Sequence, residues 1–166
     1  MNNLSIVLST FNEESNIKQT LVKLLNNTSV KEIIIVDDSS TDNTVNIINH
    51  LRNDKIKLFI RKTTKGFASA FIFGIIMSSG NYILRFDLDM HTEIDFFIKT
   101  FEKNKDKDCV IFSRYVNNGF DSRSNYRKIS SLLLNTICQY LLSKKIKDYT
   151  SCIMFFKRDL LSDIFP

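Results

Sequence analysis

The feature that most constrains this sequence is the alternation of continuous apolar runs with amphipathic segments along its whole length. The runs, rich in Ile, Val and Leu, are typical of strands buried on both faces, and the segments repeat apolar residues every three or four positions, as helices do. Strands are expected over residues 4–8, 32–36, 56–60, 82–86, 109–112 and 152–156, and helices over 67–79, 94–103 and 126–142. Two more helices are indicated by Ile17, Leu21, Leu24 and Leu25 and by Val45, Ile48 and Leu51. This order predicts an α/β fold with a mostly parallel sheet flanked by helices.

Charge and hydropathy restrict the partners. The 166 residues carry a net charge of +5, which favours an anionic partner such as a phosphorylated ligand, a nucleic acid or an acidic membrane surface. The basic residues are not regularly interleaved with aromatic ones, so we do not expect nucleic-acid binding. The longest apolar block, residues 70–77, is too short to span a bilayer, and no signal-peptide pattern follows Met1. We therefore expect a cytoplasmic protein whose membrane contact is peripheral or made through a membrane-anchoring subunit.

The cysteines agree with a cytosolic location. Cys109, Cys138 and Cys152 are widely spaced and odd in number, and no C-x-x-C pair occurs. Structural zinc and a disulfide framework are therefore not expected. We expect reduced, mostly buried thiols.

Polar clusters follow four of the expected strands, at residues 9–13, 37–39, 87–91 and 113–115. Ligands of open parallel sheets bind beyond the carboxyl ends of the strands. The four clusters therefore predict a binding site at that edge of the sheet.

The cluster after the fourth expected strand contains Asp87 and Asp89, one residue apart. Alternation along a strand would place both carboxylates on one face and Leu88 on the other. Neighbouring carboxylates repel unless a cation lies between them, and Mg²⁺ or Mn²⁺ takes oxygen ligands and completes its coordination with substrate phosphates. The alternative is a loop in which both aspartates are solvated, and the three other clusters weigh against it.

These motifs resemble the inverting family 2 glycosyltransferases of GT-A fold. The matching segments are S-T-F-N-E at 9–13, I-I-V-D-D-S at 34–39, K-G-F-A-S-A at 65–70, G-N-Y at 80–82 and D-L-D-M at 87–90. A second set resembles the narrower branch of dolichyl- or polyprenyl-phosphate sugar synthases: S-R-Y at 113–115, R-K-I-S-S at 127–131, Asn135, and D-Y-T-S at 148–151. The resemblance covers residues 4–162. It implies a Rossmann-like GT-A domain over 1–166, with a nucleotide-binding half over about 1–90 and an acceptor half over about 91–166.

The resemblance implies roles for the donor side. Phe11 stands where the family has a Tyr that stacks on the nucleotide base, and Glu13 and Asp38 resemble positions that hold base and ribose. The other donor-side candidates are Ser9, Lys65 and Leu88.

Asp87 and Asp89 would hold the Mg²⁺ or Mn²⁺ that bridges the diphosphate, and His91 would be a third ligand or an outer-shell partner. Alternatively, His91 is a surface residue, Lys65 is a solvated lysine and Asp37 braces its loop.

On the acceptor side, Arg114, Arg127 and Ser131 resemble groups that grip the phosphate of a lipid, a task suited to guanidinium forks. With Asp89 they form the expected catalytic set. Arg127 and Lys128 could instead be a solvated helix face. A lipid phosphate is largely ionised near neutral pH, since its second pKa is about 6, and needs no general base.

The resemblance therefore implies transfer of mannose or glucose from GDP- or UDP-hexose to a polyprenyl phosphate, with inversion, at the cytoplasmic face of a membrane. Two alternatives stay open: a family 2 transferase with a glycan or protein acceptor, which would need a general base, and a catalytically weak nucleotide-sugar-binding protein. The sequence departs from the family at residues 151–154, which lack the Gly and Arg of S-G-F-R, and at Ala68, which replaces a loop glycine. We also expect the domain to be shortened at its C-terminal end.

One helix carries an apolar stripe that we expect to face the core rather than lipid. The stripe consists of Leu132, Leu133, Leu134, Ile137 and Leu141. The basic residues that follow it, Lys144, Lys145 and Lys147, form either a solvated turn or a patch attracted to an anionic leaflet.

Overall fold

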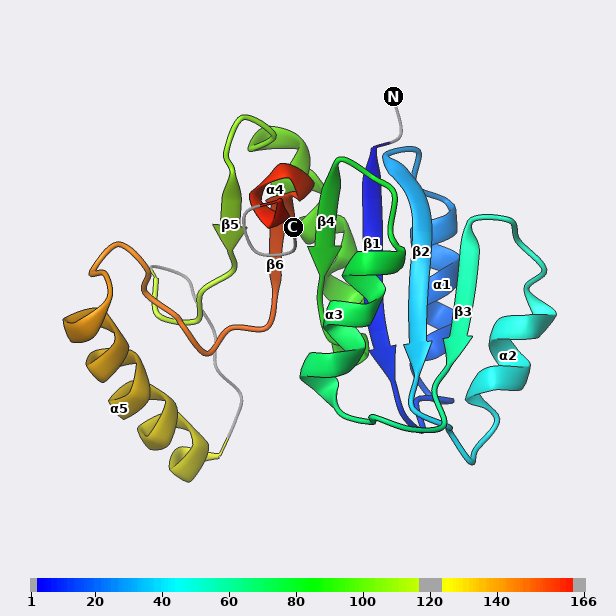
Figure 1. Cartoon of the computed structure of the whole chain (residues 1–166), viewed down its shortest axis with the longest axis horizontal. Coiled ribbons are helices and arrows are strands. Elements are labelled where there is room, and N and C mark those ends of the chain that lie inside the picture. The colour runs from blue at the N-terminus through cyan, green and yellow to red at the C-terminus, as the bar shows by residue number, and fades with distance from the viewer. Residues whose placement is uncertain (1–2, 117–123, 163–166) are drawn as a thin grey trace.

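The strands form a single six-stranded sheet in the computed structural model, which describes residues 3–116 and 124–162 (Figure 1). They are β1 (Leu4–Thr10), β2 (Val30–Asp37), β3 (Ile56–Ile60), β4 (Tyr82–Arg85), β5 (Cys109–Ile111) and β6 (Met154–Lys157). Their order is β3-β2-β1-β4-β6-β5. The first four are mutually parallel, whereas β6 runs antiparallel to both β4 and β5. The predicted α/β fold with a mostly parallel sheet flanked by helices is confirmed.

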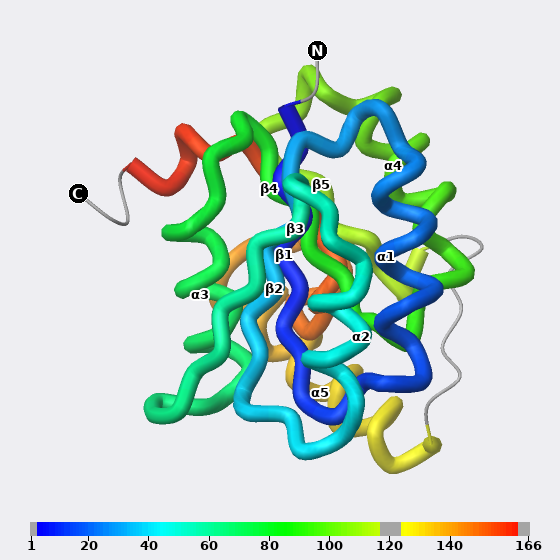
Figure 2. The backbone as a smooth tube through the Cα atoms, turned by 90° about the vertical axis from the view of Figure 1, so that its right-hand side faces the viewer, coloured from blue at the N-terminus to red at the C-terminus, as the bar shows by residue number. Residues whose placement is uncertain are grey.

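The helices cover both faces of the sheet. They are α1 (Ile17–Leu25), α2 (Thr44–His50), α3 (Phe67–Met77), α4 (Ile94–Lys103) and α5 (Asn125–Leu141), with 3-10 helices η1 (Leu88–Glu93) and η2 (Arg158–Leu161). Figure 2 shows α3 on one face and α1 and α4 on the other. Of the described helices, none is both long and apolar enough to cross a bilayer.

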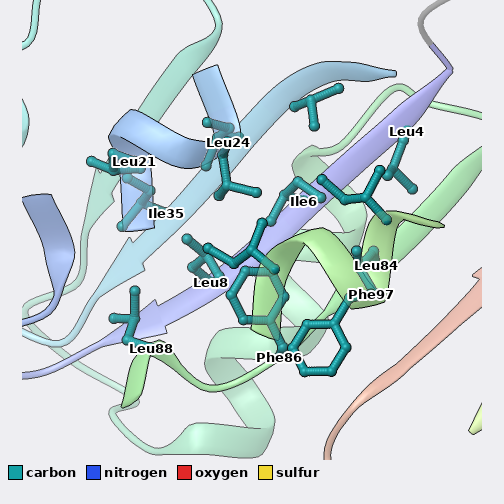
Figure 3. Packing of buried hydrophobic residues seen from close by; sticks show 14 of the residues in the cluster. Leu4, Ile6, Leu8, Leu21, Leu24, Ile35, Leu84, Phe86, Leu88 and Phe97 are labelled. Atoms are coloured by element: carbon teal, nitrogen blue, oxygen red, sulfur yellow. The ribbon is translucent and has the colours of Figure 1, made fainter. Parts of the chain in front are cut away.

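Alternation along β1 builds the two halves of the core. Leu4, Ile6 and Leu8 lie on the α1 and α4 face, among buried residues of β2, α1 and α4 (Figure 3). Val7 faces α3, and Gly74 of α3 lies against it: a Cβ on Gly74 would lie 2.4 Å from Val7 Cγ1. Glycine therefore lets α3 approach the sheet closely. Each fully buried aliphatic side chain contributes about 1.5–3 kcal/mol.

Helix α5 departs from the predicted packing. Figure 1 shows it standing apart from the sheet, and among its residues only Asn135 is buried. The stripe that we expected in the core is 46–69% exposed, so that prediction is wrong. The physical reason is that α5 is attached through a polar residue, Asn135, which hydrogen-bonds the segment before β6.

Two smaller predictions concern the cysteines and the loop over 114–123. All three cysteines are free, but Cys109 is exposed and Cys138 and Cys152 are half-buried, so the prediction of mostly buried thiols is wrong. The loop expected over 114–123 lies partly outside the described residues, which omit 117–123.

Candidate functional site

A cleft of about 380 Å³ lies beyond the carboxyl ends of β1, β2 and β4, where the sequence predicted a binding site. The segments after these strands and the start of α3 form its walls. The lining residues are Ser9, Thr10, Phe11, Glu13, Asp38, Phe67, Asp87, Leu88 and Asp89. Seven of these nine are residues that the sequence assigned to the donor or the metal, so one cleft brings them together.

The two acids reach this cleft through a turn rather than through strand alternation. Strand β4 ends at Arg85, Asp87 has extended backbone geometry before η1, and Asp89 lies in the first turn of η1. Both acids therefore follow the strand, as the sequence predicted, but strand alternation does not extend to Asp89, which lies in η1. Leu88, between them, is only 3% exposed and packs in the core, which fixes η1 to the sheet.

Arg85 holds Asp87 from below the cleft. Its side chain is 3% exposed, and its Nη2 donates to Asp87 Oδ1 at 2.9 Å. Its Nη1 donates to the carbonyl of Cys152, and its guanidinium carbon lies 3.9 Å from the ring centroid of Phe67. Arg85 thus connects Asp87 and Phe67, which line the cleft, to the segment that precedes β6.

The two aspartates at the end of β2 have different tasks. Asp37 is fully buried and accepts hydrogen bonds from the Thr10 hydroxyl at 2.9 Å and from the Ser40 backbone N–H at 2.8 Å. It braces the loop, as the alternative interpretation held. Asp38 lines the cleft, and its two oxygens accept from Arg61 Nε and from the Gly66 N–H, each at 2.8 Å. Asp38 therefore fixes the start of α3 against the cleft.

The loop after β1 is fixed to the loop after β2. Asn12 adopts a positive φ of 56°, and its Oδ1 accepts from the Thr41 N–H at 2.8 Å. The Glu13 N–H donates to the Thr44 hydroxyl at 2.8 Å, while Glu13 Oε2 accepts from Asn16 Nδ2 at 2.9 Å. Phe11 is 56% exposed beside these contacts, so its ring is accessible for stacking.

Two predicted donor-side residues do not line the cleft. Lys65 is exposed in the loop that precedes Gly66. His91 is half-buried at the far end of η1, its Nδ1 is buried without a hydrogen-bond partner, and its carbonyl accepts from Lys23 Nζ at 3.1 Å. Across residues 3–116 and 124–162, no three His, Cys, Asp or Glu side chains are grouped to hold a metal ion. A role of His91 at a metal stays a prediction.

A second cluster is organised by Asp148, whose side chain is fully buried. Arg114 binds it at two points, Nε to Oδ2 at 2.8 Å and Nη2 to Oδ1 at 2.9 Å. The Thr150 hydroxyl donates to Oδ1 at 2.9 Å. Burial alone would raise the pKa of Asp148, but the hydrogen bonds from Arg114 and Thr150 outweigh it and lower the pKa. The carboxylate is thus held ionised as the partner of Arg114.

This cluster also anchors α5. Asn135 Nδ2 donates to the Thr150 hydroxyl at 3.2 Å and to the Ser131 carbonyl at 2.9 Å, and its Oδ1 accepts from the Tyr149 N–H. Three parts of the predicted acceptor motif, around Arg114, Ser131 and Asp148, therefore meet. Arg127 is exposed on the first turn of α5, away from these bonds.

The donor and acceptor groups do not line a common cleft. Arg114, Arg127 and Ser131 are absent from the lining of the cleft that holds Asp87 and Asp89. The two regions are joined instead through the chain before β6: Arg85 binds the Cys152 carbonyl, and Asp148 and Thr150 lie a few residues earlier. The expected meeting of acids and guanidiniums in one cavity is therefore not seen in this structure.

Four residues of these sites were not predicted from the sequence: Thr10, Phe67, Arg85 and Asp148. The sequence indicates Phe67 only as the first residue of a helix, although it stands inside the K-G-F-A-S-A motif. Arg85 is a charge in an apolar strand, and a buried charge demands a partner, so that signal was present. Asp148 stands in the D-Y-T-S segment, but no neighbouring residue in the sequence indicates that it pairs with Arg114.

Known proteins resemble this chain in sequence over nearly its whole length. The family model described as Glycosyl transferase family 2 matches residues 5–165. A Dictyostelium discoideum dolichyl-phosphate beta-glucosyltransferase is 32% identical over 98% of this chain and 56% of its own length. A Pyrococcus furiosus dolichol-phosphate mannosyltransferase is 28% identical over 97% of this chain and 48% of its own. The chain thus spans about half the length of these relatives.

Solved structures share the fold. Glucosyl-3-phosphoglycerate synthase from Mycobacterium tuberculosis, in complex with UDP, superposes with a TM-score of 0.69 at 17% identity, over 97% of this chain and 58% of that one. S. aureus TarS superposes with a TM-score of 0.62 at 23% identity, over 97% of this chain and 48% of that one.

Proposed function

Because this chain belongs to glycosyl transferase family 2 and has the GT-A fold, we propose that it is an inverting, metal-dependent transferase that moves a hexose from a nucleotide sugar to a polyprenyl phosphate. One observation carries the proposal: seven residues that the sequence assigned to the donor or its metal line one cleft at the carboxyl edge of the sheet. The names of the relatives from D. discoideum and P. furiosus support the choice of acceptor.

The cleft suits a nucleoside diphosphate sugar of the GDP or UDP type. Phe11 offers an accessible aromatic face for the base, and Glu13 and Asp38 supply carboxylate oxygens that can accept from base or ribose. Phe67 forms part of the wall near Asp87. In support, the M. tuberculosis structure with the same fold was solved with UDP.

The acids fit a hard divalent ion. Asp87 and Asp89 both line the cleft, and Arg85 binds only Oδ1 of Asp87, which leaves its other oxygen for a cation. Two carboxylates suffice for Mg²⁺ or Mn²⁺, which take phosphate oxygens and water as further ligands. A bound ion would supply Lewis-acid stabilisation to the departing nucleoside diphosphate. A neighbour of this fold was solved with Mn²⁺ and UDP-glucose, which supports this assignment.

The acceptor phosphate requires positioning rather than deprotonation, because it is already largely ionised near neutral pH. Arg114 donates hydrogen bonds from Nε and Nη2 to Asp148, and these bonds hold the guanidinium in a fixed orientation. Arg127 is exposed on α5, where it can approach a phosphate that comes from outside the protein. The proposal places the reaction at the cytoplasmic face of a membrane.

A different acceptor is the second candidate, favoured by the separation of Arg114 and Arg127 from the cleft. A glycan, a protein hydroxyl or a small phosphorylated alcohol would then take the sugar. The M. tuberculosis neighbour, a glucosyl-3-phosphoglycerate synthase, was solved in complex with phosphoglyceric acid. A third candidate is nucleotide-sugar binding without transfer.

Incubation with labelled GDP- and UDP-hexoses and a short polyprenyl phosphate, with and without Mg²⁺ or Mn²⁺, tests the proposal. We expect metal-dependent formation of a lipid-linked sugar. Transfer to a hydroxyl acceptor alone would favour the second candidate, and nucleotide binding with no transfer to any acceptor would favour the third.

Asp89→Asn removes one proposed ligand while keeping the shape of the side chain. We expect it to weaken Mn²⁺ binding, measured by electron paramagnetic resonance without substrate, and to abolish transfer. Asp95→Asn, in the exposed first turn of α4, is the matched control and should change neither. Unaltered Mn²⁺ binding by Asp89→Asn would contradict the metal assignment.

A further inference from the structure

Helix α5 exposes its large apolar residues to water, whereas the one residue that it buries against the protein, Asn135, is polar. The side toward the protein carries Asn135, which is buried, and Ser131 and Cys138, which are half-buried. The large apolar residues of the helix and its C-terminal end are exposed by 46–85%: Tyr126, Ile129, Leu132, Leu133, Leu134, Ile137, Tyr140, Leu141 and Leu142. An amphipathic helix of a globular protein normally has the opposite arrangement, and an exposed apolar face of this size marks an interaction surface.

The charge of the same segment is exclusively positive. Residues 124–147 contain five basic residues, Arg127, Lys128, Lys144, Lys145 and Lys147, and no Asp or Glu. The whole chain has 23 Lys and Arg against 18 Asp and Glu. Outside this segment 18 basic residues therefore balance 18 acidic ones, and the entire net charge of +5 resides on α5 and the turn after it.

We propose that α5 and the turn at 143–147 dock onto an anionic phospholipid surface, with the helix lying in the plane of the interface. An apolar face beside basic residues is the pattern of interfacial helices. At 1.5 Å per residue the 17 residues of α5 form a rod of about 25 Å. Tyr126 and Tyr140, 82% and 85% exposed, have the amphipathic rings that favour the headgroup level.

Charge argues against the other occupants of this face. A second copy of the chain would bring another five positive charges against the first five, which repel, and an apolar protein groove would leave the lysines without partners. An anionic leaflet satisfies both properties of the segment at once. Both views place α5 at the end of the sheet where β1, β2 and β3 terminate, so the docked protein would hold its cleft near the lipid (Figures 1 and 2).

Vesicle co-sedimentation tests this docking without donor sugar or polyprenyl phosphate, so its outcome is independent of whether transfer occurs. Wild-type protein is mixed with phosphatidylcholine vesicles, with or without 30% phosphatidylserine, at about 0.1 M NaCl, where the Debye length is about 10 Å. We expect binding to the anionic vesicles at least tenfold tighter than to the neutral ones, and a loss of this preference at 1 M NaCl.

Two sets of variants assign the binding to α5. Lys144→Gln with Lys145→Gln and Lys147→Gln should weaken it on the order of 100-fold, since each basic residue near an anionic surface contributes about fivefold. Leu133→Gln with Leu141→Gln should weaken binding to a similar degree. Matched controls are Lys18→Gln with Lys99→Gln and Lys103→Gln, exposed lysines of α1 and α4, and Ile60→Gln with Ile76→Gln, which are 51% and 58% exposed elsewhere.

Circular dichroism establishes that each variant is folded. Retained binding by the two control variants, with loss in both α5 variants, would support the proposal. Absence of vesicle binding by the wild type, or equal binding by the α5 variants, would overturn it. A wild-type dimer seen by light scattering, dissociated by Leu133→Gln with Leu141→Gln and unable to bind vesicles, would likewise overturn it and identify the face as an interface between copies.

Discussion

Arg85 and Asp87 form an ion pair at the base of the cleft, 2.9 Å from Nη2 to Oδ1, in which the arginine is buried and the aspartate is 44% exposed. The guanidinium is also stacked on Phe67 and hydrogen-bonded to the Cys152 carbonyl. Its contacts therefore fix the orientation of a carboxylate that we propose as a metal ligand. Partners of this kind, behind a ligand, set the affinity of a site for its ion.

Arg85→Lys should keep the positive charge but lose the planar fork that contacts Asp87, Cys152 and Phe67 together. We expect Mn²⁺ binding, measured without substrate, and sugar transfer to fall by about 10–100-fold. Arg158→Lys is the matched control, because Arg158 donates to the Gly80 carbonyl at 2.8 Å far from the cleft. Arg85→Lys with wild-type Mn²⁺ affinity would show that the pair does not orient a ligand.

Glu32 ties together the amino-terminal ends of three strands and the loop before β4. It is 3% exposed and accepts hydrogen bonds from the Ser5 hydroxyl at 2.6 Å, from Lys57 Nζ at 2.7 Å and from Ser79. Burial alone would raise its pKa, but these donors outweigh burial and bring the pKa from 4.5 to about 2. The ionised form is therefore bound more strongly in the folded state than in the unfolded state.

Glu32→Gln should lower the free energy of unfolding at pH 7 by about 3 kcal/mol, since each pKa unit corresponds to about 1.4 kcal/mol. A carboxyl whose pKa is lowered by folding stabilises the folded state at pH values above its unfolded pKa. The stabilisation from Glu32 is therefore lost as the pH falls from about 4.5 toward 2. Urea unfolding across this range should show the gap between wild type and variant closing. The exposed Glu93→Gln is the control, and a gap that stays constant with pH would contradict the assignment.

The sheet and its functional edge could be predicted because their signals are local. Continuous runs such as 32–36 identify buried strands, and the polar residues that follow them must meet at one edge of a parallel sheet. The bounds of β3 and α4 agree with the sequence, and the cleft contains the predicted Phe11, Asp38 and Asp89. The roles of these residues in the reaction stay predictions.

The features that the sequence did not predict depend on contacts between distant parts of the chain. A stripe such as Leu133 and Ile137 shows that a helix has an apolar side, but it does not show which side of the helix contacts the rest of the protein. In α5 the contacting side is the one that carries Asn135, which hydrogen-bonds residues 149 and 150. The same holds for Arg114, whose pairing with Asp148 spans 34 positions. The 3-10 helix η1 could not be predicted either, because six residues are too few to show a periodicity that separates them from a strand end.

Asp148→Asn should destabilise the second cluster strongly. Removing the charge leaves Arg114 without the carboxylate that it binds at two points, and breaking one side of a buried ion pair costs about 3 kcal/mol or more. Urea unfolding measures the loss, and vesicle binding should weaken with it because Asn135 and α5 are anchored to the same cluster. Asp106→Asn, which removes an exposed pair with Lys107, should leave stability unchanged. A stable Asp148→Asn protein would show that Asn135 and Thr150 hold α5 without the ion pair.

Gly66 occupies a backbone conformation that other residues avoid, with φ at +129°, and its N–H donates to Asp38 at 2.8 Å. Gly66→Ala should therefore cost about 1–3 kcal/mol of stability, even though a Cβ would have space, its nearest neighbour being Ser69 Oγ at 3.9 Å. Relief of that strain would withdraw the N–H from Asp38 and shift Phe67, so nucleoside diphosphate binding should weaken more than stability alone explains. Calorimetric titration with UDP and GDP measures it, with Thr63→Ala in the same exposed loop as control. Because the strain lies in the backbone and not in packing, Ser69→Ala, which enlarges the neighbouring space, should not restore nucleotide binding to Gly66→Ala. Restored binding in the double variant would mean that a steric contact, and not the positive φ, is the reason for glycine at position 66.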